Sequence, residues 1–321
     1  MCARVRDGVE GAETTSRPWV NDGRIFPLLD IPRGELERLV DGPIASVEPV
    51  TGGYTNTLHR VVLASGGVVT VKHYAAGAGA FADELATLTQ LAGILPVPEV
   101  VRADASRCAI VYRWIEGITL DDCRRGEPPQ AFASLADPLG RLFAWLARTP
   151  PPVAGARWDV KPVTAVALTQ LTSGRARDRL GKPLADAMAR AIERAGDQLA
   201  WGTPCLSHGD IGGRNILVQR ALRDRWRIGG VIDWEAAATG SPLVDVGSLF
   251  REPARYDGAF LAAFERGYRE ADGVLPDDWY RTSRTLDAFK LIDTLAEDRE
   301  LPGVFAECRM LLAKLVADLA A

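Results

Sequence analysis

Residues 208–215 read His208-Gly209-Asp210-Ile211-Gly212-Gly213-Arg214-Asn215, and residues 231–234 read Val231-Ile232-Asp233-Trp234. These two short segments place one His, two Asp and one Asn in an order that suits metal-assisted phosphoryl transfer. Asp210 is the candidate to take the proton of an acceptor hydroxyl, and Asn215 and Asp233 are the candidates to hold Mg²⁺ against nucleotide phosphates. We expect His208 to brace the loop by hydrogen bonding rather than to act as an acid or base.

The spacing between the two segments supports one shared site. The stretches 215–219 and 227–232 are largely apolar and lie between Asp210 and Asp233, which predicts a β-hairpin that folds back on itself. Such a hairpin would bring Asn215 and Asp233 to one metal ion. The alternative, two unrelated loops, does not account for the further signals of a nucleotide site earlier in the chain.

The composition is that of an ordinary globular protein. Of the 321 residues, 47% are hydrophobic and 25% are charged, and the net charge of −4 argues against a general nucleic-acid binder. No stretch reaches the roughly 20 apolar residues of a membrane span, and residues 1–22 lack the apolar core of a signal peptide. The cysteines are scattered, which predicts reduced thiols and a cytoplasmic location. We expect no nucleic-acid, membrane or obligate protein partner.

Hydrophobic periodicity and turn signals divide the chain into two halves. The first half predicts an antiparallel sheet with strands at 46–50, 58–64, 68–74, 100–103 and 109–114, a hairpin turn at 65–67 and helices after Pro32 and at 81–91. The second half predicts helices at 130–147, 163–171, 184–201, 243–250, 257–269, 279–295 and 304–320. The predicted fold class is therefore α+β, with a small five-stranded lobe, a larger helical lobe and a ligand-binding cleft between them.

The first half also carries signals of a phosphate site. Gly52 and Gly53 lie in a turn between two expected strands, where Thr55 and Asn56 would donate hydrogen bonds to phosphate oxygens, although a plain β-turn would look the same. Nearly every positively charged residue is an Arg, but a Lys, Lys72, ends the strand that follows the two strands joined by this turn. The ammonium group of Lys is a compact point charge that suits phosphate oxygens. The lysines of the chain are Lys72, Lys161, Lys182, Lys290 and Lys314.

Lys72 needs a carboxylate partner, and Glu84 is the candidate. On a helix that begins at Phe81, Glu84 falls inside the apolar stripe, between Leu88 and Leu91. A carboxylate on a buried face is unfavourable unless it is paired. The alternative is a position at the edge of the stripe, where Glu84 would reach water.

Three segments together resemble the aminoglycoside phosphotransferase family of small-molecule kinases. They are the His-Gly-Asp-x-x-x-x-Asn loop at 208–215, the Ile-Asp-Trp-Glu segment at 232–235 and the Gly-Ser-Pro-Leu-Val-Asp-Val stretch at 240–246. The resemblance covers about residues 44–300 and implies a protein-kinase-like two-lobe fold that binds ATP, or GTP, with Mg²⁺. On this comparison the chain divides into an N-terminal extension (1–43), a nucleotide-binding N-lobe (44–112), a hinge (113–117) and a helical C-lobe (118–321).

The resemblance also implies roles for individual residues. In the hinge, the Arg113 carbonyl and the Ile115 N–H would bind the adenine, with Tyr112 behind the base. Tyr112 is larger than the residue often found there, which bears on the choice between ATP and GTP. Asp245 would open a helix and support the catalytic loop together with His208, and it can act in the N-cap region of that helix at the same time.

The acceptor is the part that the sequence determines least. No activation segment of the protein-kinase type follows Asp233, which favours a small molecule over a protein. Glu235, with Asp293 and Glu297 one helical turn apart, would suit a polycationic acceptor, although such acidic groups are usually a solvated helix face. We predict ATP-dependent O-phosphorylation of a small hydroxylated molecule such as an aminoglycoside or another antibiotic. The alternatives are a metabolic kinase for homoserine, choline or a glycated amine, and a catalytically silent nucleotide-binding regulator.

Overall fold

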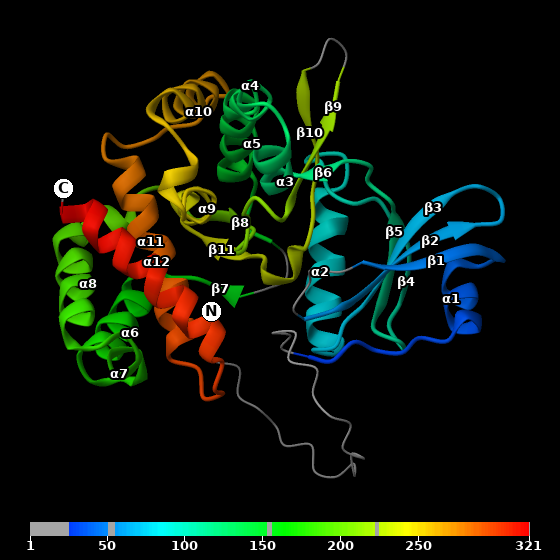
Figure 1. Cartoon of the computed structure of the whole chain (residues 1–321), viewed down its shortest axis with the longest axis horizontal. Helices are drawn as coiled ribbons and strands as arrows, with labels where there is room; N and C mark the ends of the chain where they lie inside the picture. Colours follow the sequence, from blue (N-terminus) through cyan, green and yellow to red (C-terminus); the bar gives the residue numbers. More distant parts are fainter. Residues whose placement is uncertain (1–25, 51–54, 153–155, 222–224, 321) are drawn as a thin grey trace.

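Five antiparallel strands form the sheet of the N-lobe, in the order β1-β2-β3-β5-β4 (Figure 1). The computed structural model describes residues 26–50, 55–152, 156–221 and 225–320. The strands are β1 (Ile44–Val50), β2 (Thr57–Leu63), β3 (Val68–His73), β4 (Val100–Asp104) and β5 (Ala109–Arg113). The predicted hairpin turn is present, because the Leu63 N–H donates to the Gly67 carbonyl at 2.8 Å and Gly66 has a φ of 92°.

One helix covers each face of this sheet. α1 (Arg33–Val40) packs Leu36 and Leu39 against the apolar side chains of one face, among them Val71. α2 (Ala78–Leu91) covers the other face, where the rings of Phe81 and Tyr74 meet edge to face with centroids 5.8 Å apart. The core of the N-lobe therefore includes α1, which lies before residue 44.

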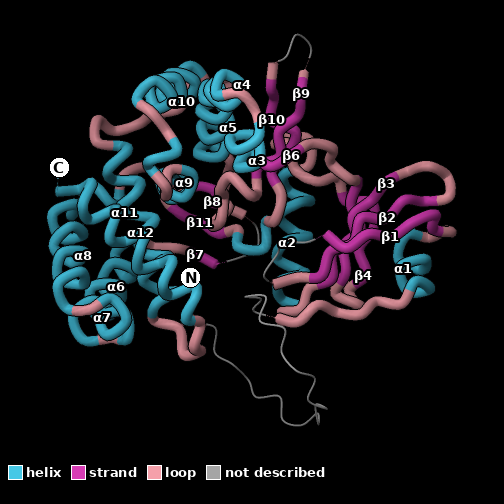
Figure 2. Tube along the Cα trace, viewed as in Figure 1, coloured by secondary structure: helices cyan, strands magenta, loops and turns pink. Residues whose placement is uncertain are grey.

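The C-lobe is mostly helical, as Figure 2 shows. Its helices are α3 (Leu120–Gly126), α4 (Pro129–Ala133), α5 (Ala136–Arg148), α6 (Val160–Ser173), α7 (Arg175–Leu180), α8 (Lys182–Ala195), α9 (Pro242–Leu249), α10 (Gly258–Glu270), α11 (Trp279–Leu295) and α12 (Pro302–Ala320). The far end of α2, with Leu88 and Leu91, belongs to the same apolar core as these helices. α2 thus lies between the sheet and the C-lobe (Figure 1). Within the described ranges, no helix is long and apolar enough to cross a membrane.

Two small sheets carry the segments that bear the candidate site. β9 (Ile216–Arg220) and β10 (Trp226–Val231) form the predicted hairpin, and β6 (Ile118–Thr119) adds to its edge directly after the hinge. The second sheet contains β7 (Ala156–Arg157), β11 (Ala238–Gly240) and β8 (Cys205–Ser207). β8 leads into residues 208–215, and β10 leads into Asp233, so the two sheets hold the two segments side by side.

The hinge is fixed to the C-lobe by this hairpin. Gly117 has a φ of 136°, and a side chain there would come within 2.5 Å of the Val218 carbonyl of β9. The Gln219 side-chain amide also donates to the Glu116 carbonyl at 2.6 Å. The chain therefore enters the C-lobe along β9.

Two predicted helices differ from the structure. The expected helix at 130–147 is broken into α4 and α5 at Ser134 and Leu135. Pro138 accounts for the break, because a proline has no N–H to donate and is accommodated only in the first turn of a new helix. The expected helix at 184–201 ends as α8 at Ala195, where Gly196 has a φ of 49°, and continues as a short 3-10 turn. The short elements α3, α7, β6, β7, β8 and β11 were not predicted.

Candidate functional site

A buried carboxylate on α9 holds the backbone of the 208–215 loop. Asp245 lies in the first turn of α9 and accepts hydrogen bonds from the N–H groups of His208 (2.7 Å) and Gly209 (3.0 Å) and from the Ser207 hydroxyl (3.0 Å). Burial raises the pKa of Asp245, although His208 and these hydrogen bonds act in the opposite direction. Ser241 caps the helix by accepting from the Leu243 N–H at 3.3 Å. The first turn of α9 therefore fixes the start of the loop.

His208 is fully buried, and both of its ring nitrogens are used. Nδ1 accepts a hydrogen bond from the Asp210 N–H at 3.2 Å, which assigns the ring hydrogen to Nε2, and Nε2 lies 3.0 Å from the Ile232 carbonyl. The ring packs against Trp234 with centroids 4.5 Å apart. His208 thus connects the loop to the segment that carries Asp233, an arrangement that fits the expected bracing role.

Glycine is required at position 209 by the geometry. Gly209 has a φ of 78°, and a side chain at this position would overlap the Ala236 carbonyl. Gly212 has open space around it. The space beside Gly213 is instead taken by the Asp121 carboxylate.

Asp210 has a cationic partner that the sequence did not indicate. Lys290 of α11 donates to Oδ1 of Asp210 and, at 3.0 Å, to the Gly209 carbonyl. Burial by itself would raise the pKa of Asp210, but Lys290 and, at longer range, Arg251 lower it below its ordinary value, so the carboxylate is ionised. Lysine is rare in this chain, and the rarity that drew attention to Lys72 holds equally for Lys290.

The ion pair expected between Lys72 and Glu84 is present and buried. Lys72 Nζ lies 2.7 Å from Oε2 of Glu84 and 2.6 Å from Oδ1 of Asp233. Burial by itself would lower the pKa of Lys72, but Asp233 and Glu84 raise it well above its ordinary value. The second oxygen of Glu84 accepts from the Trp234 N–H at 3.2 Å. The ammonium of Lys72 therefore joins α2 to the segment after β10.

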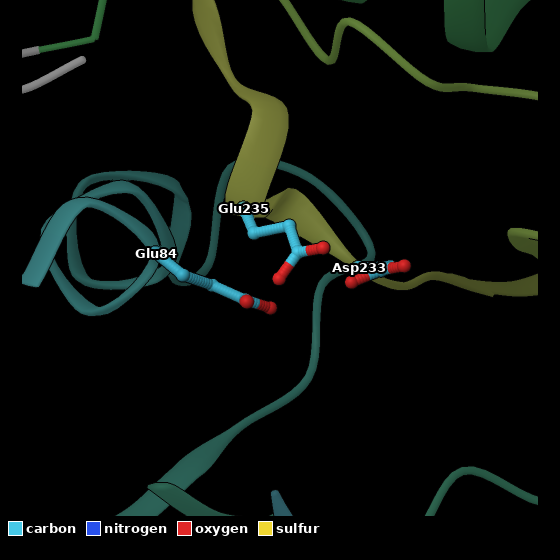
Figure 3. A group of neighbouring side chains, drawn as sticks. All are labelled: Glu84, Asp233 and Glu235. Atoms are coloured by element: carbon cyan, nitrogen blue, oxygen red, sulfur yellow. The ribbon is translucent and has the colours of Figure 1, made fainter. Parts of the chain in front are cut away.

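Three carboxylates gather around this ammonium group. The ligand atoms of Glu84, Asp233 and Glu235 all lie within 4.8 Å of one another. In Figure 3, the carboxylates of Glu84 and Glu235 point toward each other, with Asp233 beside them. Asp233 adopts a left-handed backbone conformation (φ 69°, ψ 62°) that starts a 3-10 turn and brings Glu235 back toward Lys72. Carboxylate oxygens in this arrangement fit Mg²⁺, which prefers oxygen ligands.

Glu235 is placed differently from the sequence expectation. It was expected on the acceptor side, but its Oε2 lies 3.8 Å from Lys72 Nζ and accepts a hydrogen bond from the Asn56 side chain. Burial, together with the nearby charge of Asp233, raises the pKa of Glu235 to about 7. Glu235 thus lies beside Lys72 and Asn56, and its contact with an acceptor stays a prediction.

Asn215 lies where the loop meets the hairpin. Its Nδ2 donates to the Asp210 carbonyl at 2.9 Å, and its own carbonyl accepts from the Ile232 N–H at 2.9 Å. The residue that precedes Asp233 is therefore hydrogen-bonded to Asn215, as the predicted hairpin requires. The role of Asn215 as a metal ligand stays a prediction.

The remaining candidates for nucleotide binding lie at residues 52–56, of which the structure describes only the last two. Gly52 and Gly53 lie outside the described residues, and Thr55 is half-buried directly after that gap. Asn56 is buried, and besides Glu235 it contacts the Ala75 N–H, which donates to Asn56 Oδ1 at 3.2 Å. In this structure the Asn56 side chain links the two lobes.

The hinge residues are positioned by their neighbours on both lobes. Tyr112 is buried with Tyr74 under α2. The Arg113 side chain is exposed and forms an ion pair with Glu99 at 2.8 Å. Ile115 lies against Gly230 of β10, where a larger residue would displace it. Base recognition by the hinge backbone stays a prediction.

The acidic pair expected on one helix face is not arranged in that way. α11 ends at Leu295, so Asp293 is in its last turn and Glu297 follows the end of the helix. The Glu297 carbonyl accepts from Arg179 at 2.8 Å. Burial and the charge of Glu297 raise the pKa of Asp293.

Comparisons with known proteins agree with this architecture. The model of the family described as "Phosphotransferase enzyme family" matches residues 46–282. One similar solved structure is the GDP and kanamycin complex of APH(2")-IIia, with 21% identity, a TM-score of 0.70, and coverage of 88% of this chain and 97% of that chain. Another is the macrolide 2'-phosphotransferase MphH from Brachybacterium faecium, with 17% identity, a TM-score of 0.65, and coverage of 88% and 95%.

A third similar structure is a choline/ethanolamine kinase family protein from Mesorhizobium loti, with 18% identity, a TM-score of 0.58, and coverage of 89% of this chain and 97% of that chain. At these identities the likeness shows the fold, which is protein-kinase-like. No curated protein sequence matches the chain.

Proposed function

The chain belongs to the phosphotransferase enzyme family, and on that premise we propose that it transfers the terminal phosphoryl group of ATP to a hydroxyl group of a small molecule. One observation carries the proposal. Lys72 of the N-lobe contacts Asp233, and the hydrogen bond between Ile232 and Asn215 joins the Asp233 segment to the loop that bears Asp210. Lys72 and Asp233, which suit the nucleotide phosphates, therefore lie next to the loop that carries Asp210, whose carboxylate suits the acceptor hydroxyl.

On the phosphate side, Lys72 would bind oxygens of the nucleotide phosphates, and Glu84 holds its side chain in place. Asn215, Asp233 and Glu235 would hold Mg²⁺ through amide and carboxylate oxygens. When bound, the metal ion neutralises charge on the phosphates. We assign Thr55 and Asn56 to the phosphates and the backbone of 113–115 to the base.

On the acceptor side, Asp210 would orient the hydroxyl and receive its proton. The acceptor oxygen forms a bond to the terminal phosphorus, the bond from that phosphorus to the bridging oxygen of ADP breaks, and the proton passes to the Asp210 carboxylate. His208 and Asp245 hold the loop so that Asp210 stays in place. The lowered pKa of Asp210 supports this role, because only the ionised carboxylate accepts a proton.

For the acceptor we propose a small molecule, in the first place an aminoglycoside or another antibiotic. After Asp233 the chain runs through a 3-10 turn and β11 directly into α9, so residues 234–249 contain no long segment that would dock a protein substrate. The alternative is a metabolic kinase for choline, homoserine or a glycated amine, and the similar structures guide which acceptors are tested. The proposed use of ATP, together with free cysteine thiols in the described chain, supports a cytoplasmic location.

The test is a panel of acceptors with purified protein and Mg²⁺ with ATP or GTP. Kanamycin, a macrolide, choline, homoserine and a fructosamine are each supplied, release of the nucleoside diphosphate is measured, and the phosphorylated product is identified by mass spectrometry. We expect transfer to at least one acceptor. Tight binding of ATP without transfer to any of them would instead favour the catalytically silent regulator.

Asp210→Ala should lower the transfer rate by at least about 100-fold and leave ATP binding, measured by calorimetry, unchanged. Asp178→Ala on α7 is the matched control, because Asp178 is exposed and lies in the same lobe. Undiminished transfer by Asp210→Ala would remove Asp210 from the mechanism.

A further inference from the structure

The carboxylate that the proposed reaction uses as its proton acceptor is already bound by a cation. Lys290 donates to Oδ1 of Asp210 and to the carbonyl of the preceding Gly209. The same ammonium group therefore holds both the side chain of Asp210 and the backbone that carries it. Within the described chain, no hydrogen bond from another residue reaches Oδ2 of Asp210, and the side chain is 35% exposed.

Lys290 lies on α11, a helix that packs closely against α9. α11 packs against α9 so closely that a side chain at Gly247 would overlap the Ser283 carbonyl. α9 is also the helix whose Asp245 holds the loop backbone. The position of Lys290 relative to the loop is therefore set by direct backbone contact between two helices.

A second ion pair secures the same helix face. Arg251, just after α9, contacts both oxygens of Asp287 at 2.7 and 2.6 Å. Asp287 precedes Lys290 by about one helical turn on α11, so the two residues share a face. Arg251 forms its ion pair with Asp287, and in the described chain Lys290 is the cation that directly contacts Asp210.

We propose that Lys290 is a positioning residue, which fixes one carboxylate oxygen of Asp210 so that the other oxygen faces the acceptor hydroxyl. This inference rests on the proposed function, in which Asp210 receives the proton of that hydroxyl. Asp245 holds the loop backbone, and Lys290 holds the side chain. The Lys290–Asp210 ion pair is partly exposed, and such pairs contribute little to stability, so its contribution is to geometry.

The first experiment measures transfer by Lys290→Met and Lys290→Arg with the acceptor that the panel identifies. We expect kcat to fall by about 100-fold in Lys290→Met, because a small misplacement of a reacting group has an effect of that size, with little change in the KM for ATP. Lys290→Arg should recover part of the loss, because a guanidinium can reach both acceptors. Lys161→Met is the control, since Lys161 is exposed on α6.

A double-mutant cycle distinguishes positioning from a separate role. If Lys290 acts through Asp210, then Lys290→Met should cause no further loss of kcat in an Asp210→Ala background. A further loss of about 100-fold in that background, or a fall in melting temperature without rescue by arginine, would overturn the inference and assign Lys290 a purely structural or independent role.

A second experiment does not depend on any acceptor. Crystal structures of the wild-type protein and of Lys290→Met, both with Mg²⁺ and ADP, would show the orientation of Asp210 directly. We expect a changed rotamer or more than one orientation of the Asp210 carboxylate in the variant. An unchanged orientation of the Asp210 carboxylate in Lys290→Met would overturn the inference, even if phosphoryl transfer is confirmed. A wild-type protein that phosphorylates no acceptor would instead reject the proposed function. In that case the comparison of the two crystal structures would still decide the role of Lys290.

Discussion

Lys72 Nζ lies 2.6 Å from Oδ1 of Asp233, a residue 161 positions later in the chain. Lys72 belongs to β3 of the N-lobe, and Asp233 follows β10 of the C-lobe. One buried ammonium group thus joins the two lobes beside the carboxylates that suit a metal ion.

Replacement of this lysine should destabilise the fold. Lys72→Met would leave the buried Glu84 carboxylate without its partner, and removing one member of a buried ion pair lowers the free energy of unfolding by about 3 kcal/mol. Urea denaturation measures this difference. Lys161→Met is the exposed control, and the double variant Lys72→Met with Glu84→Leu should recover part of the loss. Equal stability of Lys72→Met and the wild-type protein would contradict the prediction.

Two glycines of the same loop should respond differently to alanine. Gly209→Ala should lower the free energy of unfolding by about 2 kcal/mol and abolish transfer, because position 209 combines a positive φ with a close backbone neighbour. Gly212→Ala meets nothing within 4 Å and should leave the fold unchanged. Thermal denaturation of the two variants provides the comparison, and similar melting temperatures would count against the geometry described for Gly209.

Asp245 should matter more for stability than its single charge suggests. Asp245→Ala removes the acceptor of three donors on residues 207–209, two of them buried, and should lower the free energy of unfolding by about 3 kcal/mol. The exposed Asp178→Ala serves as the control. Chemical denaturation gives the difference, and amide hydrogen exchange at His208 and Gly209 should become faster in the Asp245 variant alone. Unchanged protection at both amides would argue that other groups hold the loop.

The raised pKa of Glu235 predicts a dependence of stability on pH. The folded protein keeps the proton on Glu235 up to a pKa of about 7, whereas the unfolded chain releases it near the ordinary value of 4.5. Within that window the folded state binds more protons, so the stability of the wild-type protein falls as the pH rises from 4.5 to about 7. Glu235→Gln lacks this contribution.

The measurement compares melting temperatures of the wild-type protein and Glu235→Gln in metal-free buffer at several pH values across this window. The wild-type protein should lose stability relative to the variant as the pH increases, and Mg²⁺ should restore it at the upper end. A constant difference between the two proteins would show that Glu235 titrates normally.

Local sequence signals predicted the elements that depend on neighbouring residues. The turn at Gly66, the hairpin of β9 and β10 and the pairing of Lys72 with Glu84 follow from turn preferences and periodicity over a few positions. The break between α4 and α5 had a local cause as well, the missing N–H of Pro138, which the apolar spacing of 130–147 concealed.

Other contacts depend on packing that no local pattern encodes. Lys290 reaches Asp210 only because α11 lies directly against α9, and the sequence separates the two residues by 80 positions. Glu235 turns toward Lys72 because Asp233 adopts a left-handed backbone conformation, which is uncommon outside glycine. Asn56 meets Glu235 across the two lobes. The sequence therefore indicated the pairing of Lys72 with Glu84, but it did not indicate that Glu235 lies beside them.

Three contacts from the N-lobe converge on only three consecutive residues, because Lys72 contacts Asp233, Glu84 accepts from the Trp234 N–H, and Asn56 donates to Glu235. A nucleotide with its metal ion would compete for the same carboxylates. On the proposed function, nucleotide binding would be an exchange of partners, in which the cross-lobe contacts that are broken oppose the phosphate contacts that are formed. Stronger cross-lobe contacts at residues 233–235 would then weaken nucleotide binding.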